Sequence, residues 1–320
     1  GLKMATSLNI LVLNKLADRH RAAIAAAAPG ATVTTTDLEH AGEYIADTDI
    51  LVTWGWMDIR SLYLAAPRLK WVHALSAGVE MLTFPEIQAS DTILTNSKGI
   101  HGIPLSEHVF AMILAFSRGF NLLFRRQQEK KWERVPTDEV HEKTIGIVGL
   151  GSIGREIAKK AKGLGMEVVA TKREMTAEIF VDKLYRADQL HEMLGVVDFL
   201  VVALPLTEET TGLFTLKEFA AMKPSAYFFN IARGAIVRET DLVEALRRGL
   251  IKGAGLDVFA AEPLPEDSPL WEMENVIISP HIGALSPYYL DRAVKLFVDN
   301  LTRYTQNREM FNIIDKAKGY

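Results

Sequence analysis

The stretch "KTIGIVGLGSIGREIAKKAKGLGMEVVATKRE", Lys143 to Glu174, decides the fold. It contains a β-branched strand pattern, a glycine-rich turn, a helix and a second strand. Gly149, Gly151 and Gly154 give the spacing G-x-G-x-x-G directly between strand and helix. The first glycine permits a tight turn, the second lets a pyrophosphate approach the backbone, and the third lets helix and strand pack closely. This order predicts a dinucleotide site with the phosphates at the helix N-terminus.

The second strand of this stretch ends on basic residues. In a fold of this kind that accepts NAD, an acidic residue at the strand end binds the adenine ribose. Here the position is Lys172, followed by Arg173. Ammonium and guanidinium groups bind a 2′-phosphate, which a carboxylate would repel. We therefore expect NADP(H) to be preferred and NAD(H) to be possible; the alternative is that both basic residues are only solvent-exposed.

Short apolar strands alternate with helical patterns along the chain, as in βαβ units of a parallel sheet. The strand-like runs outside the opening stretch are "LNILVLN", "DILVTW", "LKWVHAL", "TILTN", "DFLVVALP", "AYFFNIA", "GAGLDVF" and "NVIISPH". We expect an α/β protein with two Rossmann-like or flavodoxin-like domains, each on a parallel sheet. Residues 1–100 and 282–320 are predicted to form a discontinuous substrate domain, and residues 101–281 the dinucleotide domain. The expected ligand site is the cleft between them.

Helical patterns are predicted at Arg19 to Ala28, at Pro85 to Ala89, from about His101, and in "YYLDRAVKLFVDNLTRYT" near the C-terminus. The pattern after His101 runs into the charged "RRQQEKKWER". We interpret this run as a solvated helix face rather than a site for polyanions, because glutamates are interspersed among its basic residues.

Composition limits the function classes. The chain has 320 residues, is 48% hydrophobic and carries a formal net charge of -4, which argues against binding nucleic acid or anionic membrane through overall charge. Cysteine is absent, which excludes disulfides, thiolate metal ligands and a cysteine nucleophile, and no metal site is predicted. The apolar run after Met4, the expected natural start, is too short for a signal peptide, and no run is long enough to span a membrane. We expect a cytoplasmic protein with a small-molecule substrate.

Three residues at strand ends together supply what carbonyl reduction requires. They are Arg233 in "NIARGA", Glu262 in "DVFAAEPLP" and His281 in "SPHIGA". A cation suits a substrate carboxylate and a developing oxyanion, a histidine suits proton donation, and a carboxylate orients the ring. Taken singly, each has an ordinary structural explanation: a surface ion pair, a loop turn and a structural histidine.

The motifs "GLGSIG", "ALPLTEETTGL", "NIARGAIV", "GAGLDVFAAEPLP" and "NVIISPHIGA", with the closing "GY", resemble the D-isomer-specific 2-hydroxyacid dehydrogenase family. The resemblance covers nearly the whole chain and is most specific from Gly149 to Ala284. It implies reversible hydride transfer between a nicotinamide and a 2-keto acid, giving the D-2-hydroxy acid. It also implies a two-domain fold and a homodimer.

Carried over by position, the resemblance makes Arg233, Glu262 and His281 the catalytic triad. In the loop "LSAGVE", the backbone amides that bind the substrate carboxylate are those of Ser76, Ala77 and Gly78. The resemblance also implies a cofactor site along the strand ends of the dinucleotide domain, in which Asp257 holds the nicotinamide carboxamide. The full set of implied cofactor residues is Gly149, Gly151, Ser152, Ile153, Gly154, Lys172, Arg173, Leu204, Pro205, Thr210, Ile231, Ala232, Arg233, Asp257, His281 and Gly283.

Departures from family patterns narrow the alternatives. Formate dehydrogenase relatives carry glutamine at the position of Glu262, and phosphite dehydrogenase relatives carry lysine at the position of Ser76, so both activities are disfavoured. Trp54 in "TWGWMD" either walls the substrate side-chain pocket or is a core or interface tryptophan. If Trp54 lines the pocket, a branched or aromatic 2-keto acid fits, whereas glyoxylate would underfill it.

The leading hypothesis is an NADPH-preferring 2-ketoacid reductase with His281 as acid and base. One alternative is a glyoxylate or hydroxypyruvate reductase with the same mechanism. Another is a non-catalytic NAD(P)-binding regulator of the corepressor kind, which would have no use for a complete Arg/Glu/His set.

Overall fold

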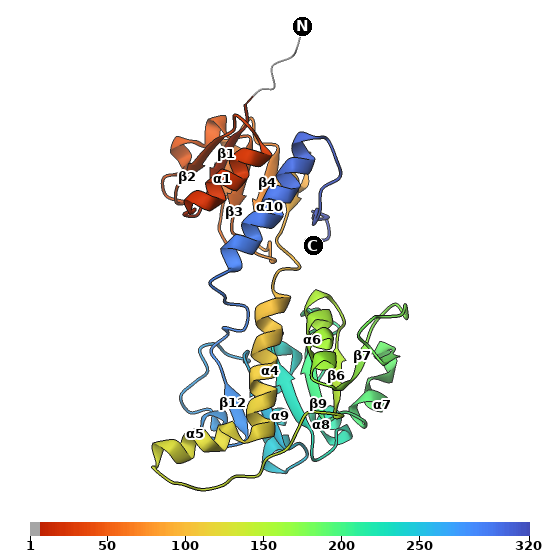
Figure 1. The fold of residues 1–320 in the computed structure, drawn as a ribbon. Helices are drawn as coiled ribbons and strands as arrows, with labels where there is room; N and C mark the ends of the chain where they lie inside the picture. Colours follow the sequence, from red (N-terminus) through yellow and green to blue (C-terminus); the bar gives the residue numbers. More distant parts are fainter. Residues whose placement is uncertain (1–6) are drawn as a thin grey trace. The chain divides into compact units, whose positions relative to one another are not determined.

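The computed structural model describes residues 7–320, so the expected start at Met4 lies outside the described part. Within residues 7–320 the chain forms two compact units, one of residues 7–100 with 286–320 and one of residues 101–285 (Figure 1). The sequence predicted that the chain returns to the first domain between His281 and Ile282, whereas the structure places this boundary between Leu285 and Ser286. The reason is that the amides of Ile282 and Gly283 donate hydrogen bonds to the Asp257 carboxylate, which keeps them with the second unit. No helix in the described part is long and apolar enough to cross a membrane.

The sheet of the first unit has five parallel strands among the described residues, in the order β2-β1-β3-β4-β5. This is a flavodoxin-like order, as expected for one of the two domains. The strands are β1 (Asn9–Val12), β2 (Thr32–Thr35), β3 (Ile50–Thr53), β4 (Trp71–Ala74) and β5 (Ile93–Thr95). Four of them follow the apolar runs identified in the sequence, and the edge strand β2 does not.

Both faces of this sheet are covered, so successive strand residues enter two different cores. One face packs against α1 and α10, which lie side by side in Figure 1. The other face packs against the short helices and loops between the strands. The helical elements of this unit are α1 (Asp18–Ala27), η1 (Ala41–Glu43), η2 (Ile45–Asp47), α2 (Arg60–Leu64), α3 (Pro85–Gln88) and α10 (Tyr289–Thr305).

The sheet of the second unit has seven parallel strands among the described residues, in the order β12-β11-β10-β9-β6-β7-β8. This is the doubly wound Rossmann order, and the chain direction across the sheet switches between β6 and β9. The strands are β6 (Thr144–Val148), β7 (Glu167–Thr171), β8 (Lys183–Tyr185), β9 (Phe199–Val202), β10 (Tyr227–Asn230), β11 (Gly253–Leu256) and β12 (Val276–Ile278).

Helices cover both faces of this second sheet. α4 and α6 pack side by side on one face, and α7, α8 and α9 pack on the other. The helical elements are α4 (Gly102–Arg118), α5 (Phe120–Gln128), α6 (Ser152–Gly163), η3 (Ala187–Gln189), α7 (Leu190–Leu194), α8 (Leu216–Ala221), η4 (Gly234–Ile236), α9 (Glu239–Arg247) and η5 (Pro269–Glu272).

The charged run after α4 is helical only in part. α5 ends at Gln128, and the following residues are irregular. Arg126 forms an ion pair of 3.1 Å with Glu133, and Lys131 forms one of 3.1 Å with Glu129. Two basic residues of the run are thus paired with the interspersed glutamates, although the helix expected to carry the run stops early.

Candidate active site

The carboxyl ends of the parallel strands bring the predicted residues of the second unit to one edge of its sheet. Gly149 follows β6, Lys172 follows β7 and Asp257 follows β11. Backbone bonds tie neighbouring ends together: the Ala203 amide donates to the Val148 carbonyl at 2.9 Å, and the Asp257 amide to the Asn230 carbonyl at 3.1 Å. Open α/β sheets bind their ligands at this edge, next to the switch point.

The glycine turn after β6 has the shape that a dinucleotide requires. Gly149 has a φ of +94°, a left-handed conformation that strains other residues. A Cβ on Gly154 would lie 2.8 Å from the Gly149 carbonyl oxygen, so helix and strand approach too closely for a side chain. A Cβ on Gly151 would meet no protein atom within 4 Å, which leaves open space at the N-terminus of α6, where Ser152 and Ile153 begin the helix. The turn therefore fits the pyrophosphate of a bound dinucleotide.

The loop after β9 packs over this turn. The Leu204 side chain would contact a Cβ on Gly149 at 2.7 Å, so the two segments are in close contact. The Thr210 hydroxyl donates to the Pro205 carbonyl at 2.8 Å and also accepts a bond of 2.8 Å from the Thr207 amide. Thr210 thus closes a compact loop that fixes Leu204 and Pro205 beside the glycines.

His281 and Glu262 form a direct pair. His281 Nδ1 lies 2.7 Å from Glu262 Oε2. An ionised carboxylate only accepts hydrogen bonds, so Nδ1 carries the proton and Nε2 is the nitrogen that can exchange a proton with another molecule. About half of the His281 side chain is exposed, at 49%, which leaves the ring accessible.

Competing effects act on the pKa of Glu262. Partial burial raises it, but hydrogen bonds from His281 and from the Phe259 amide, together with the charges of His281 and Arg233, lower the pKa of Glu262 below its ordinary value. Glu262 is therefore ionised at neutral pH and accepts the hydrogen bond from His281 Nδ1.

Arg233 lies on the loop after β10. Asn230 shapes this loop, because its side-chain oxygen accepts from the Ala232 amide at 3.1 Å and its side-chain nitrogen donates to the Arg233 carbonyl at 3.0 Å. The exposed Arg233 guanidinium donates to the Ala232 carbonyl at 2.8 Å. Ile231 and Ala232 themselves are buried. Burial first, and the charge of Arg233 second, lower the pKa of His101, a histidine that sequence reasoning did not single out for the site.

Asp257 is buried, and its carboxylate organises the loop that carries His281. It accepts bonds of 2.9 Å from the Ile282 and Gly283 amides and one of 2.7 Å from the Ser279 hydroxyl. His108 lies 2.8 Å from the same hydroxyl. Sequence reasoning missed Ser279 and His108, and "SPHIGA" itself contained the signal for Ser279, since it stands two residues before His281 at a strand end. The backbone of His281 is left-handed, with a φ of +53°, and these bonds hold the strained residue in place.

In the first unit, hydrogen bonds of the Ser76 side chain and of the Ala77 and Gly78 carbonyls hold the loop "SAG" after β4. The Ser76 hydroxyl accepts from the Gly55 amide at 2.8 Å and donates to the Gly78 carbonyl at 2.7 Å. The Asn96 side chain donates to the Ala77 carbonyl at 2.8 Å. Within the described part of the chain, no protein atom accepts a hydrogen bond from the Ala77 or Gly78 amide. Two free amides on a fixed loop can bind a carboxylate.

Trp54 is part of an aromatic stack beside this loop. Its ring centroid lies 6.4 Å from that of Trp56 and 6.0 Å from that of Tyr289. Its indole nitrogen donates to the Asn14 side chain at 3.2 Å, and the indole is only partly exposed. Trp56, which was not singled out from the sequence, is 64% exposed and presents the more open face.

The basic pair after β7 is not free. Lys172 Nζ lies 2.6 Å from the Thr176 hydroxyl and 2.9 Å from a carboxylate oxygen of Glu178. Arg173 is largely exposed and contacts Glu209 at 3.4 Å. The strand end is basic as predicted, but a carboxylate of the same loop already binds Lys172.

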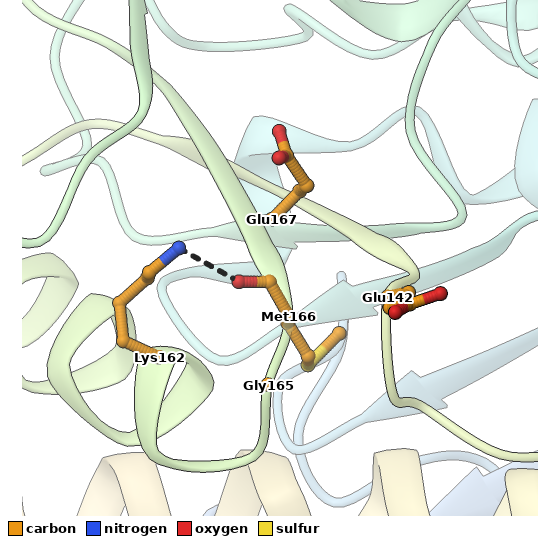
Figure 2. Close-up of a pocket in the computed structure, with 5 residues that line it drawn as sticks. All are labelled: Glu142, Lys162, Gly165, Met166 and Glu167. Atoms are coloured by element: carbon orange, nitrogen blue, oxygen red, sulfur yellow. Dashed lines mark hydrogen bonds between the residues drawn. The ribbon is translucent and has the colours of Figure 1, made fainter.

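A pocket of about 440 Å³, shown in Figure 2, belongs to the opposite edge of the second sheet. It is lined by Glu142, Lys162, Gly165, Met166 and Glu167. Glu167 begins β7, so the pocket lies at the amino ends of the strands, where ligands of this fold do not bind. The Lys162 ammonium donates to the Met166 carbonyl at 3.1 Å and to the Asp182 carboxylate at 2.8 Å, so this cation is already bonded within the protein. Within residues 7–320 no group of three or more His, Asp or Glu side chains could hold a metal ion.

Comparison with known proteins identifies the family. A model described as D-isomer specific 2-hydroxyacid dehydrogenase, NAD binding domain, matches residues 110–283, which is more than half of the chain. The chain belongs to this family. The dehydrogenase is therefore an NAD(P)-dependent oxidoreductase that acts on the CH–OH group of 2-hydroxy acids and reduces 2-keto acids.

Similar proteins support this assignment along most of the chain. A glyoxylate/hydroxypyruvate reductase B of Pectobacterium carotovorum is 38% identical over 242 residues, which are 74% of this chain and 76% of that protein. A family member from Aeromonas salmonicida has a crystal structure with a TM-score of 0.85 and 34% identity, covering 97% of this chain and 100% of that one. An NADPH-dependent glyoxylate/hydroxypyruvate reductase of Sinorhizobium meliloti, solved with NADP and sulfate, has a TM-score of 0.80 and 30% identity, covering 98% and 100%.

Proposed function

We propose that the dehydrogenase reduces a 2-keto acid to the D-2-hydroxy acid, with NADPH as the preferred donor and His281 as the acid and base. The observation that carries this proposal is the His281–Glu262 pair of 2.7 Å, on a loop at the ligand-binding edge of a Rossmann sheet. The nicotinamide supplies the hydride when it is bound.

The protein's own residues handle charge and protons. His281 Nε2 donates a proton to the substrate carbonyl oxygen during reduction and takes it back in the reverse direction. Glu262 holds the ring through Nδ1 and stabilises the imidazolium. Arg233, with the free amides of Ala77 and Gly78, binds the substrate carboxylate, and the Arg233 charge favours the developing oxyanion.

The proposed cofactor residues follow the strand ends. The turn of Gly149, Gly151 and Gly154 binds the pyrophosphate, and Asp257 bonds the nicotinamide carboxamide through its remaining acceptor capacity. Lys172 and Arg173 favour a 2′-phosphate. The NADP complex of the Sinorhizobium meliloti reductase supports the same preference here.

Two substrate classes are compatible with this mechanism. The reductases from Pectobacterium and Sinorhizobium carry names that favour glyoxylate and hydroxypyruvate. The aromatic stack of Trp54 and Trp56 beside the "SAG" loop favours a larger, apolar side chain. A non-catalytic regulator remains the alternative from another class, and the complete Arg233, Glu262 and His281 set argues against it.

We also propose a homodimer. Among the described residues, the segment from α5 onward exposes large aromatic side chains: Phe120 at 45%, Phe124 at 60% and Trp132 fully. The rings of Phe120 and Phe124 are tilted against each other with centroids 5.6 Å apart, so they form one apolar surface, and association would remove water from it. Sedimentation equilibrium tests this; a Phe124→Glu variant should shift the population toward monomer.

A substrate panel tests the reaction. Glyoxylate, hydroxypyruvate, 2-ketoisocaproate and phenylpyruvate are each offered with NADPH and with NADH, and the nicotinamide absorbance is followed. The expected result is turnover of at least one acid with NADPH, and a fall in that turnover of about 10²–10⁴-fold in His281→Ala. A folded protein that binds NADPH and reduces none of the four would be a regulator rather than a reductase.

A further inference from the structure

Glu178 joins two cations that come from different elements. Its Oε1 atom lies 2.9 Å from Lys172 Nζ and 2.8 Å from Arg155 Nη2. Arg155 is in the first turn of α6, one residue after Gly154, and Lys172 directly follows β7. The Lys172 and Glu178 side chains are only 14% and 15% exposed, so water screens this contact less than it screens an ordinary surface pair.

The carboxylate of Glu178 is ionised at neutral pH. Hydrogen bonds from Arg155 and Lys172 lower the pKa of Glu178 to about 2. Glu178 is therefore an anion at neutral pH, held between two basic side chains.

This cluster occupies the place where the fold receives the adenine ribose, at the end of the second strand beside the glycine turn. A 2′-phosphate on that ribose is an anion of charge about -1.5 to -2 that needs the same donors. Lys172 and Arg155 already have an anionic partner, whereas Arg173 makes only an exposed contact of 3.4 Å with Glu209. A phosphate must displace Glu178 or share its donors against like-charge repulsion.

We propose that Glu178 is a specificity-determining residue: its carboxylate imitates the 2′-phosphate, competes with it for Lys172 and Arg155, and so limits the preference for NADPH over NADH. This inference rests on the proposed use of NADPH and adds the residue that sets how strongly NADPH is preferred over NADH. Glu178 lies outside the helices and strands, in the irregular segment between β7 and β8, so its substitution leaves the core of the sheet intact.

Calorimetric binding of adenosine 2′,5′-bisphosphate and of 5′-AMP tests the proposal without turnover. Glu178→Gln keeps the side-chain size and removes the charge. It should tighten bisphosphate binding about tenfold, the scale of one charge-assisted hydrogen bond, and change 5′-AMP binding less than about twofold. The matched control is Glu209→Gln, which removes the exposed carboxylate beside Arg173 and should change the ratio of the two affinities little. In Lys172→Met/Glu178→Gln the gain should disappear.

The two proposals fail in different ways. If the parent protein binds 5′-AMP as tightly as the bisphosphate, the proposed preference for NADPH is wrong. If the parent discriminates but Glu178→Gln has the same ratio of affinities, a lower ratio, or an equal gain for both ligands, the role given to Glu178 is wrong.

Discussion

Gly234, the residue after Arg233, lies so close to Phe259 that a Cβ built on it would be 2.0 Å from the Phe259 carbonyl oxygen. The loops after β10 and β11 therefore meet backbone to backbone, which brings the segment of Arg233 against the segment that leads to Glu262. Only a residue without a side chain permits this contact.

Gly234→Ala should force these loops apart. We expect the free energy of unfolding to fall by about 1–3 kcal/mol, the usual cost of inserting a methyl group into a packed region, and kcat to fall with it. Denaturant unfolding and steady-state kinetics measure the two effects. Gly163→Ala is the control, because a Cβ there meets no atom within 4 Å. Equal unfolding midpoints for Gly234→Ala and the parent would show that the loops have room.

Gly151→Ala should separate folding from cofactor binding. The added Cβ meets no protein atom within 4 Å, so the melting temperature should stay at the parent value. The methyl group would enter the space proposed for the pyrophosphate, and we expect the Kd for NADPH to rise at least about tenfold, measured by the fluorescence of the bound nicotinamide. Unchanged affinity would place the phosphates elsewhere.

His281→Ala should remove proton transfer. Turnover is expected to fall by about 10²–10⁴-fold, the usual contribution of general acid and base catalysis. The Kd for NADPH should change much less, because the glycine turn is untouched. A variant that keeps more than about a tenth of the parent kcat would assign the proton to another group.

The lowered pKa of Glu262 implies that the protein loses stability at low pH. Because its pKa in the folded protein is below the ordinary value, the ionised carboxylate stabilises the fold fully above about pH 4.3, and this contribution is lost as the pH falls through the lower folded-state pKa. Melting temperatures of the parent and of Glu262→Gln should differ by a constant, small amount between pH 5 and 7, and should converge toward pH 3. The difference is small because 37% of the Glu262 side chain is exposed. A gap that widens toward low pH would contradict the sign of the shift.

Periodic apolar runs predicted the central strands of both sheets, because buried parallel strands leave a continuous signal in the sequence. The edge strands β2 and β8 were missed. β2 is the polar segment "TVTT", and β8 is the segment "KLY" with one buried residue, so neither forms an apolar run that stands out. The end of α5 at Gln128 was also missed, since no glycine or proline marks it.

The residues of the candidate site likewise fall into those that the sequence predicts and those that it does not. Residues at strand ends, such as Arg233 and His281, could be found because a parallel sheet places all its carboxyl ends on one edge. Side-chain partners from distant segments could not be found. The bond between Arg155 and Glu178 joins α6 to a loop more than twenty residues later, and the bond between His108 and Ser279 spans a separation of 171. Such pairs depend on how the helices pack, which no local pattern records.

The order of the seven-stranded sheet has a consequence for engineering. Strands β6, β7 and β8 on one side of the switch point carry the glycine turn and the cluster around Glu178, whereas β10, β11 and β12 on the other side carry the loops of Arg233, Glu262 and His281. The residues proposed to choose the cofactor and those proposed to handle the proton therefore lie in separate halves of one sheet. A mutant library confined to residues 172–182 should change the preference between NADPH and NADH while the reaction stays the same.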